Sequence, residues 1–406
     1  MARRSLQVKS TALGSGEPDA RHDGAQRAAV EEPGQGGGVV LAVLTGAAIT
    51  PTIPAMTLLP GVRSATVDTD RLRMHYLESG PADGTAPTLV LLHGNLSTGR
   101  FYEHLMPALG ARFRVLAPDM RGFGDTEPKA LDATRGLGDW ADDLRALLGA
   151  LDLTGPPHLV GWSTAGAAIA TYATQHPVAS LTFLDPVSPY GYGGVFADGT
   201  PAYADYAGSG GGGANPEVVA RLDAGDASAD SPFTVRSMLR GLYWSPSYTL
   251  PEDREDVLVA EVLKTLTGPD GYPGDTAASP NWPGAAPGTR GILNALSPKY
   301  CHWADIVDLD PKPPILWTHG TADLVVSDSS PLDFGVLGAA GAVPGWPGAE
   351  VYPAQPMVTQ IREVLAEYEA RGGSVRVEMF EGSGHGPHVD AADAWLAVLE
   401  DFLPTP

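Results

Sequence analysis

Short apolar runs alternate with segments of helical periodicity along most of this chain, and no other feature restricts its fold as much. The runs Thr88–His93, Arg114–Pro118 and His158–Gly161 are each followed, directly or after a loop, by a segment with helical periodicity. Continuous apolar runs are typical of strands that are buried on both faces, as in a parallel sheet covered by helices. The sequence therefore predicts an α/β fold, with a mostly parallel central sheet and helices on both faces.

Further strands and helices of the same kind are expected on either side of these runs. Parallel strands joined by helices end at a common edge, and open α/β sheets bind their ligands there. The further strands expected are Ser64–Thr69, Leu72–Glu78, Ala179–Leu184, Pro314–His319 and Ser374–Phe380. The helices expected are Phe101–Leu109, Leu137–Leu151, Thr164–His176, Met357–Ala370 and Ala391–Leu403.

Glycine and proline are unusually frequent, with 50 and 37 of the 406 residues, and they concentrate where the alternation stops. Residues 1–55 lack hydrophobic periodicity, and we interpret them as a disordered extension. We predict one α/β core of residues 56–190 and 313–406. Residues 191–312 are expected to form a cap or lid inserted into that core, and residues 329–356 a second loop insertion within it.

Acidic residues outnumber basic residues 48 to 26, giving a formal net charge of −22. This charge argues against nucleic acid or an anionic membrane surface as the partner, since both require a positive patch. The single cysteine, Cys301, excludes an internal disulfide. Arg3 and Arg4 resemble the start of a twin-arginine export signal, but acidic residues separate them from the apolar run Val39–Ile49, which is too short to span a bilayer. We therefore expect a cytoplasmic protein without a membrane span.

A serine between a predicted strand and a predicted helix carries the first chemical signal. Ser163 lies between the small residues Gly161 and Ala165, in the pattern G-x-S-x-A-G. Small neighbours permit the tight turn, called the nucleophile elbow, that lifts a serine hydroxyl clear of the sheet beside a helix N-terminus. The alternative interpretation is a serine that only caps the helix.

A nucleophilic serine needs a base and a carboxylate that orients the base. Asp323 follows the predicted strand Pro314–His319, and His385 follows the last predicted strand among glycines. We predict that Ser163, His385 and Asp323 act as nucleophile, base and orienting acid. Asp185, which also follows a strand, is the main competing acid. The other competing candidates are Asp328 and His388.

Attack on a carbonyl also needs donors for the developing oxyanion. The backbone N–H of Thr164, at the start of the helix, is one expected donor. The second is expected in the turn after Thr88–His93, at the N–H of Asn95, with Leu96 as the next choice. A plain strand-to-helix turn is the alternative interpretation of this segment.

Taken in order, these motifs resemble those of α/β-hydrolase-fold serine hydrolases of the esterase and lipase kind. The resemblance extends from about residue 63 to the end of the chain. It implies a triad of Ser163, Asp323 and His385 at the carboxyl edge of the sheet, with the 191–312 segment as a cap over it. The motifs that carry it are His93-Gly94-Asn95, Asp119-Met120-Arg121-Gly122-Phe123-Gly124-Asp125, and the segments 161–166, 319–326 and 382–388.

This family carries several chemistries, so the fold does not decide the reaction. Asn95 after His-Gly also resembles haloalkane dehalogenases, but those use an aspartate nucleophile where this chain has Ser163. The sequence has no spacing typical of metal ligands and no dinucleotide fingerprint, so we expect no metal and no cofactor. We expect hydrolysis of a carboxylic ester, thioester or lactone through an acyl-enzyme.

The aromatic residues of the 191–312 segment could line a pocket for a moderately apolar acyl substrate, or they could form the core of the cap itself. Two other functions stay open. The same triad could cleave a carbon–carbon or peptide bond or carry out perhydrolysis, and a non-enzymatic receptor could use the same fold.

Overall fold

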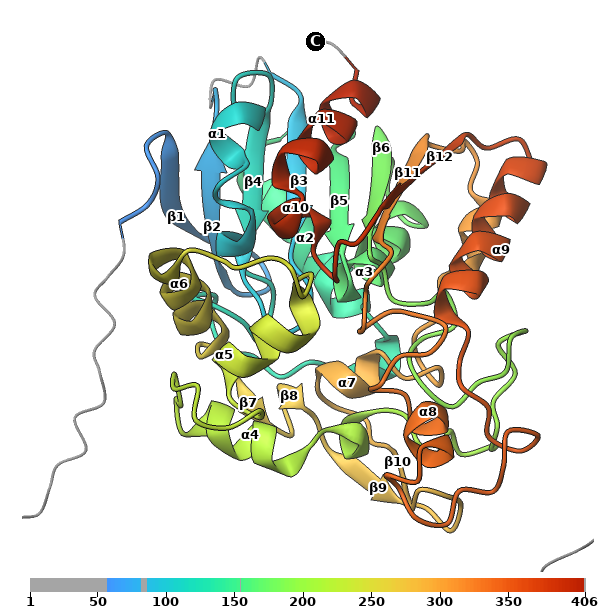
Figure 1. Ribbon diagram of the computed structural model, residues 1–406. Helices are drawn as coiled ribbons and strands as arrows, with labels where there is room; N and C mark the ends of the chain where they lie inside the picture. The colour runs from blue at the N-terminus through green and yellow to red at the C-terminus, as the bar shows by residue number, and fades with distance from the viewer. Residues whose placement is uncertain (1–56, 82–85, 154, 405–406) are drawn as a thin grey trace, which may run out of the picture. The chain divides into compact units, whose positions relative to one another are not determined.

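The computed structural model describes residues 57–81, 86–153 and 155–404, so the expected disordered extension of residues 1–55 lies outside the described residues. An eight-stranded sheet forms the centre, in the order β1-β2-β4-β3-β5-β6-β11-β12 (Figure 1). β1 and β2 pair antiparallel with their neighbours, and the other pairs are parallel. The predicted mostly parallel sheet is confirmed. The strands are β1 (Val62–Asp68), β2 (Arg73–Ser79), β3 (Thr88–Leu92), β4 (Arg114–Pro118), β5 (His158–Trp162), β6 (Ser180–Leu184), β11 (Ile315–Gly320) and β12 (Val375–Phe380).

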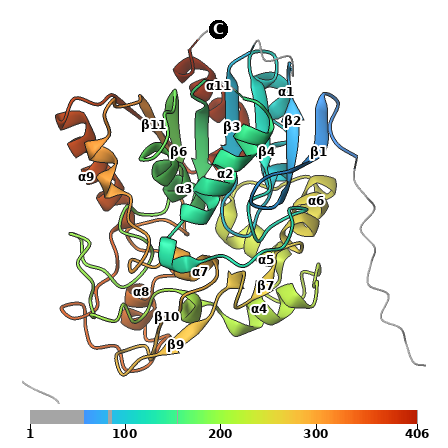
Figure 2. The same cartoon turned by 180° about the vertical axis from the view of Figure 1, so that it is seen from behind.

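Helices cover both faces of the sheet (Figures 1 and 2). α2 (Gly138–Ala150) and α3 (Thr164–Ala173) lie on one face, and α1 (Met106–Leu109) and α11 (Ala392–Phe402) lie on the other. β3, β5 and β6 are almost entirely buried between these layers, which explains their continuous apolar sequences. In the described part of the chain, no helix combines the length and the apolar character needed to cross a bilayer.

The prediction of one continuous helix over Phe101–Leu109 is wrong. The chain instead forms a 3₁₀ turn, η1 (Gly99–Tyr102), followed by the four-residue helix α1. Pro107 lies in the first turn of α1 and has no N–H to donate to a preceding turn, so it suits the start of a new helix. The other predicted strands and helices of the core are present, with ends that differ by a few residues.

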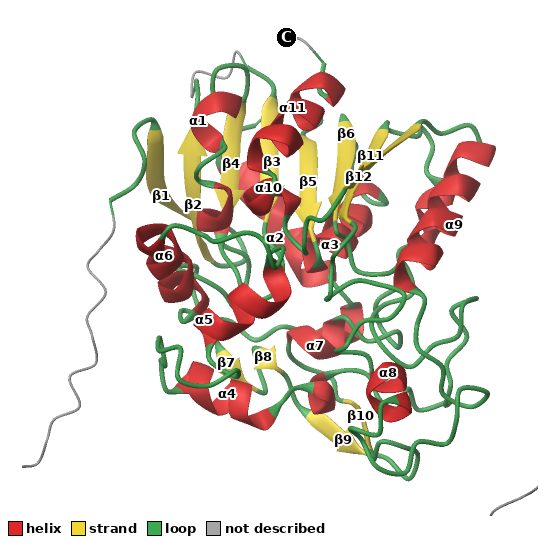
Figure 3. Ribbon diagram, viewed as in Figure 1, coloured by secondary structure: helices red, strands yellow, loops and turns green. Residues whose placement is uncertain are grey.

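The two predicted insertions lie together beyond the carboxyl edge of the sheet (Figure 1), and most of their length is loop (Figure 3). The second, residues 329–356, was expected to be a loop but contains the helix α8 (Phe334–Ala339), whose first turn Asp333 caps through Gly335 N–H. α9 (Met357–Ala370) then returns to the core. The elements between β6 and β11 are the 3₁₀ turn η3 (Gly211–Gly213), α4 (Pro216–Asp223), α5 (Val235–Met238), a π-helical turn η4 (Leu239–Tyr243), α6 (Glu252–Val262), β7 (Thr267–Gly268), β8 (Tyr272–Pro273), β9 (Thr276–Ala278), β10 (Ala285–Pro287), α7 (Ile292–Ala295) and the 3₁₀ turn η5 (Ala304–Asp308).

Buried polar contacts anchor α6 to the core. Arg254 donates to the carboxylate of Glu103 and to the carbonyl of Arg100, and Glu103 is almost completely buried. On the same helix, Glu261 accepts a hydrogen bond of 3.0 Å from Thr98 Oγ1. Because each charged group would be left buried without its partner, removal of either side would cost more than a surface ion pair is worth. α6 is therefore held firmly beside the turn that follows β3.

Candidate active site

Ser163 occupies a strained turn between β5 and α3. Its φ of 55° and ψ of −116° are rare for a residue with a side chain. The turn depends on small neighbours, since a Cβ on Gly161 would lie 2.5 Å from the carbonyl oxygen of Ala165. A Cβ on Gly94 would likewise lie 3.0 Å from the Cβ of Ser163. This conformation is that of a nucleophile elbow, and it presents the hydroxyl above the carboxyl edge of the sheet.

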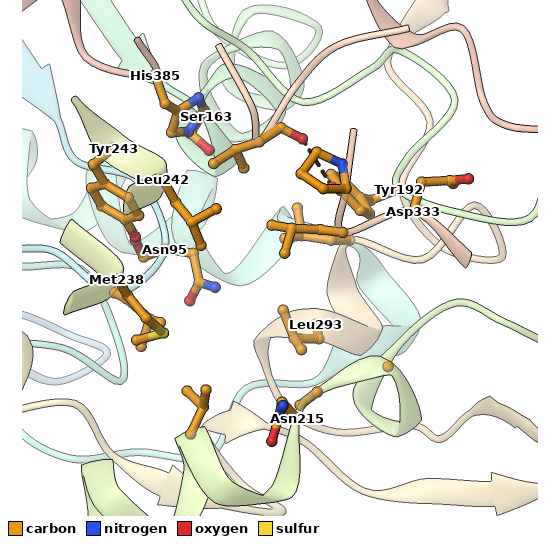
Figure 4. A pocket seen from close by; sticks show the side chains of 18 of the residues that line it. Asn95, Ser163, Tyr192, Asn215, Met238, Leu242, Tyr243, Leu293, Asp333 and His385 are labelled. Carbon is orange, nitrogen blue, oxygen red and sulfur yellow. Dashed lines mark hydrogen bonds between the residues drawn. The ribbon is translucent and has the colours of Figure 1, made fainter. Parts of the chain in front are cut away.

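The structure brings the predicted base and acid together beside this serine. His385, in the turn after β12, shares a hydrogen bond of 2.8 Å between its Nδ1 and Asp323 Oδ2. Asp323 is held in turn by the N–H groups of Val325 and Val326, which donate to Oδ1 over 2.7 and 3.0 Å. Figure 4 shows the imidazole of His385 beside the hydroxyl of Ser163. With Nδ1 bonded to Asp323, Nε2 is the nitrogen left to take a proton.

The three competing candidates have other contacts. Asp185 accepts a hydrogen bond of 2.8 Å from the N–H of Gly320, and no hydrogen bond joins it to His385 among the described residues. Asp328 is exposed and accepts from the N–H and hydroxyl of Thr359. His388 is fully buried against the indole of Trp162, 4.6 Å between ring centroids. Of the candidate acids, Asp323 is therefore the one placed to orient His385.

Both expected oxyanion donors line the same cavity as Ser163. In the described part of the chain, neither the N–H of Asn95 nor that of Thr164 donates to another group. The turn that carries Asn95 is held by His93, whose Nδ1 bonds the carbonyl of Gly94 over 2.7 Å and whose Nε2 accepts from Met120 N–H over 2.9 Å. Burial lowers the pKa of His93 to about 4, so this ring stays neutral near pH 7 and keeps both bonds.

Tyr243, at the end of η4, is a site residue that the sequence did not single out from the other aromatics. Its hydroxyl donates to the carbonyl of Asn95 over 2.9 Å, and its ring lies 5.9 Å from that of His385. It therefore braces the turn that carries Asn95 and lies beside the predicted base. No motif marks such a residue, because its position depends on how the segment between β6 and β11 folds back.

Asp185 lies behind the triad as a second buried carboxyl group. Side-chain ligand atoms of Asp185, Asp323 and His385 all lie within 4.8 Å of one another. Nδ1 of His319 lies 3.5 Å from Asp185 Oδ1, and burial lowers the pKa of His319. Burial raises the pKa of Asp185 well above its usual range, and the charge of Asp323 raises it further. Both effects favour the protonated, neutral form of Asp185.

Replacement of Asp185 by asparagine should raise stability increasingly with pH. In the wild type, the folded chain keeps a proton on Asp185 that the unfolded chain releases above about pH 4, so rising pH favours unfolding by roughly 1.4 kcal/mol per unit across that window. The amide of the variant does not titrate, so the difference in unfolding free energy between Asp185→Asn and wild type should grow from pH 4 upward. Urea unfolding at pH 4 to 7 measures it, and a flat or falling difference would contradict the neutral carboxyl.

Two groups of side chains in the described residues place potential metal ligands close together. The first is His75, Asp119 and Asp125, and the second is Asp185, Asp323 and His385. In each, the histidine Nδ1 is bonded to a carboxylate, over 2.7 Å to Asp119 and 2.8 Å to Asp323. These bonds account for both groups without an ion, and the absence of a cofactor stays a prediction.

A cavity of about 940 Å³ adjoins these residues and is lined by residues of both insertions. Ser163, Thr164, Asn95 and His385 line it, whereas Asp323 lies behind the imidazole, outside the lining. Figure 4 shows Asn215 and Leu293 on the wall opposite Ser163. The site therefore combines a serine, a histidine bonded to an aspartate, and two backbone N–H groups without a hydrogen-bond partner among the described residues, at one end of a cavity.

Comparison with known proteins gives relatives of this architecture. The model of the alpha/beta hydrolase family matches residues 89–398. A haloalkane dehalogenase of Mycobacterium marinum is 50% identical over 64 residues, which is 16% of this chain and 21% of that protein. The magnesium-chelatase 30 kDa subunit of Rhodobacter capsulatus is 38% identical over 102 residues, 25% of this chain and 34% of that protein. The chain thus spans about a fifth to a third of the length of these relatives.

Among solved structures, an esterase from Rhodococcus superposes with a TM-score of 0.52 at 18% identity. The superposition covers 84% of this chain and 98% of that one. At this identity the likeness concerns the fold alone.

Proposed function

The chain belongs to the alpha/beta hydrolase family, and from that premise we propose that it is a cofactor-independent serine hydrolase of carboxylic esters, thioesters or lactones. The observation that carries the proposal is the strained turn at Ser163 beside a His385 whose Nδ1 is bonded to Asp323 over 2.8 Å. A helix-capping serine would not need a positive φ, nor a histidine with its acid at its side.

In the proposed first half-reaction, Ser163 Oγ attacks the carbonyl carbon of the ester while its proton moves to Nε2 of His385. The carbonyl oxygen becomes an oxyanion held by the N–H groups of Asn95 and Thr164. Asp323 keeps the ring oriented and stabilises the imidazolium. The proton on Nε2 then passes to the leaving alkoxide or thiolate, and an acyl group remains on Ser163.

In the second half-reaction, water attacks the acyl carbon and gives its proton to Nε2 of His385. The tetrahedral intermediate again uses the two N–H donors, and its collapse releases the acid and returns the proton to Ser163 Oγ. We propose that the segment of residues 191–312 acts as a cap in both steps, since it encloses the cavity and its Tyr243 braces the oxyanion turn.

The relatives do not decide between reactions, because the matched lengths are short and their printed names differ in chemistry. The residue at the elbow favours acyl transfer, because a serine there forms an ester that water can cleave. The direct test is pre-steady-state hydrolysis of p-nitrophenyl esters. If the acyl-enzyme accumulates, we expect a burst of p-nitrophenol close to one equivalent per enzyme. If it does not accumulate, we expect a steady release of p-nitrophenol with equal amounts of acid. Labelling by a serine-directed probe without turnover of any ester would favour carbon–carbon or peptide cleavage instead.

A further inference from the structure

The cavity beside Ser163 is large for a small ester. Its volume of about 940 Å³ lies near the upper end of the range of ligand pockets, roughly 300–1,000 Å³, that enclose drug-sized molecules. The whole cavity has room for about thirty water molecules at liquid density. A substrate such as an acetate ester would leave most of this space to water. The size alone therefore argues for a substrate with a large group that does not react.

The walls of the cavity are apolar and come from three parts of the chain. The core supplies Val187, the segment of residues 191–312 supplies Met238, Leu242 and Leu293, and the second insertion supplies Phe334. Figure 4 shows Met238, Leu242 and Leu293 around the space that extends from Ser163 to the opposite wall. A large group in this space would lose its contact with water over most of its surface, which is favourable only for an apolar group.

The charged side chains in the lining already have partners within the chain. Arg240 donates two hydrogen bonds to the carboxylate of Glu255. Asp333 accepts from Gly335 N–H over 2.8 Å and from Val336 N–H over 3.2 Å as the cap of α8. Arg240 is thus occupied by Glu255, whereas Oδ2 of Asp333 has no hydrogen-bond partner among the described residues, so it is an anionic group of a substrate that would be buried without compensation.

We propose that the substrate is an ester, thioester or lactone without an anionic group, whose acyl or alcohol part is a long or multi-ring apolar group that fills this cavity. The inference rests on the proposed hydrolase activity and adds the size and polarity of the substrate. Leu293 and Met238 lie on different elements of the wall, and their side chains then limit the size of the apolar group that the cavity can hold.

The test uses p-nitrophenyl esters from acetate to decanoate with the full chain. We expect kcat/KM of the wild type to rise with acyl length by up to about fourfold per methylene, the fold-change that corresponds to ~0.8 kcal/mol. A second series of acetates of lengthening alcohols identifies which part of the substrate occupies the cavity. If the shortest member of each series had the highest kcat/KM, the inference would be overturned.

Variants that fill the cavity give an independent measurement. Leu293→Trp and Met238→Trp should each lower the ratio of decanoate to acetate kcat/KM at least tenfold, while Leu59→Trp, the same change at a leucine that is 39% exposed and outside the lining, should leave it unchanged. Titration of active sites with a fluorophosphonate corrects for misfolded protein. Unchanged ratios in both cavity variants would overturn the inference about substrate size but leave the proposed hydrolase activity standing. A wild type that neither reacts with the probe nor turns over esters would overturn both the proposed function and this inference.

Discussion

Ser163→Ala should lower kcat/KM for any hydrolysed ester by roughly 10⁴-fold or more. The loss is this large because no other hydroxyl can replace Oγ at the elbow, where the backbone conformation aims the side chain. The remaining rate would come from substrate binding and the N–H donors. The measurement is steady-state hydrolysis of the best p-nitrophenyl ester, with the folded state checked by circular dichroism.

Ser329→Ala provides the matched control, since Ser329 is exposed and does not line the cavity. We expect wild-type kinetics from it. Ester hydrolysis by Ser163→Ala within tenfold of the wild type would mean that the observed activity does not pass through this serine.

The acid of the triad gives the second large effect, because two aspartates compete for the role. Asp323→Asn should lower kcat by about 10³- to 10⁴-fold, since an amide can neither hold the required tautomer of His385 nor stabilise the imidazolium. Asp185→Asn should stay within about tenfold, because an amide resembles the neutral carboxyl and can still accept from Gly320 N–H. The dependence of kcat on pH, measured for both variants, separates the roles of Asp323 and Asp185 further.

The same pair of variants tests the assignment in the other direction. If Asp185→Asn lost more activity than Asp323→Asn, then Asp185 would be the acid in the working enzyme. The bond of 2.8 Å between His385 and Asp323 would then describe a different state of the site from the reacting one.

The sheet and the positions of Ser163, Asp323 and His385 at its carboxyl edge could be predicted from the sequence, because both depend on local patterns. A strand buried on both faces must be apolar throughout, so β3 and β5 are visible as runs of apolar letters. The elbow requires small residues around Ser163 within a few positions. The place of a residue after a parallel strand puts it at the carboxyl edge regardless of the rest of the chain.

The choice between Asp323 and Asp185 could not be made in this way. Both follow neighbouring strands, β11 and β6, and local sequence gives both the same edge. Hydrogen bonds separate them in the structure, since the N–H groups of Val325 and Val326 turn Asp323 toward His385 while Gly320 N–H holds Asp185 behind it.

The cavity and Tyr243 were also beyond local patterns. Their positions depend on contacts between segments far apart in the chain, such as Tyr243 with Asn95 and Arg254 with Glu103. Such contacts are made by packing rather than by periodicity, so glycine and proline frequency located the insertions without indicating what they enclose.

The central claim is that Ser163 is the nucleophile, and identification of the residue modified by a fluorophosphonate tests it most directly. The account predicts one adduct per chain, mapped by mass spectrometry to the peptide that contains Ser163 and absent from Ser163→Ala. An adduct on another residue, or equal labelling of the wild type and Ser163→Ala, would contradict it.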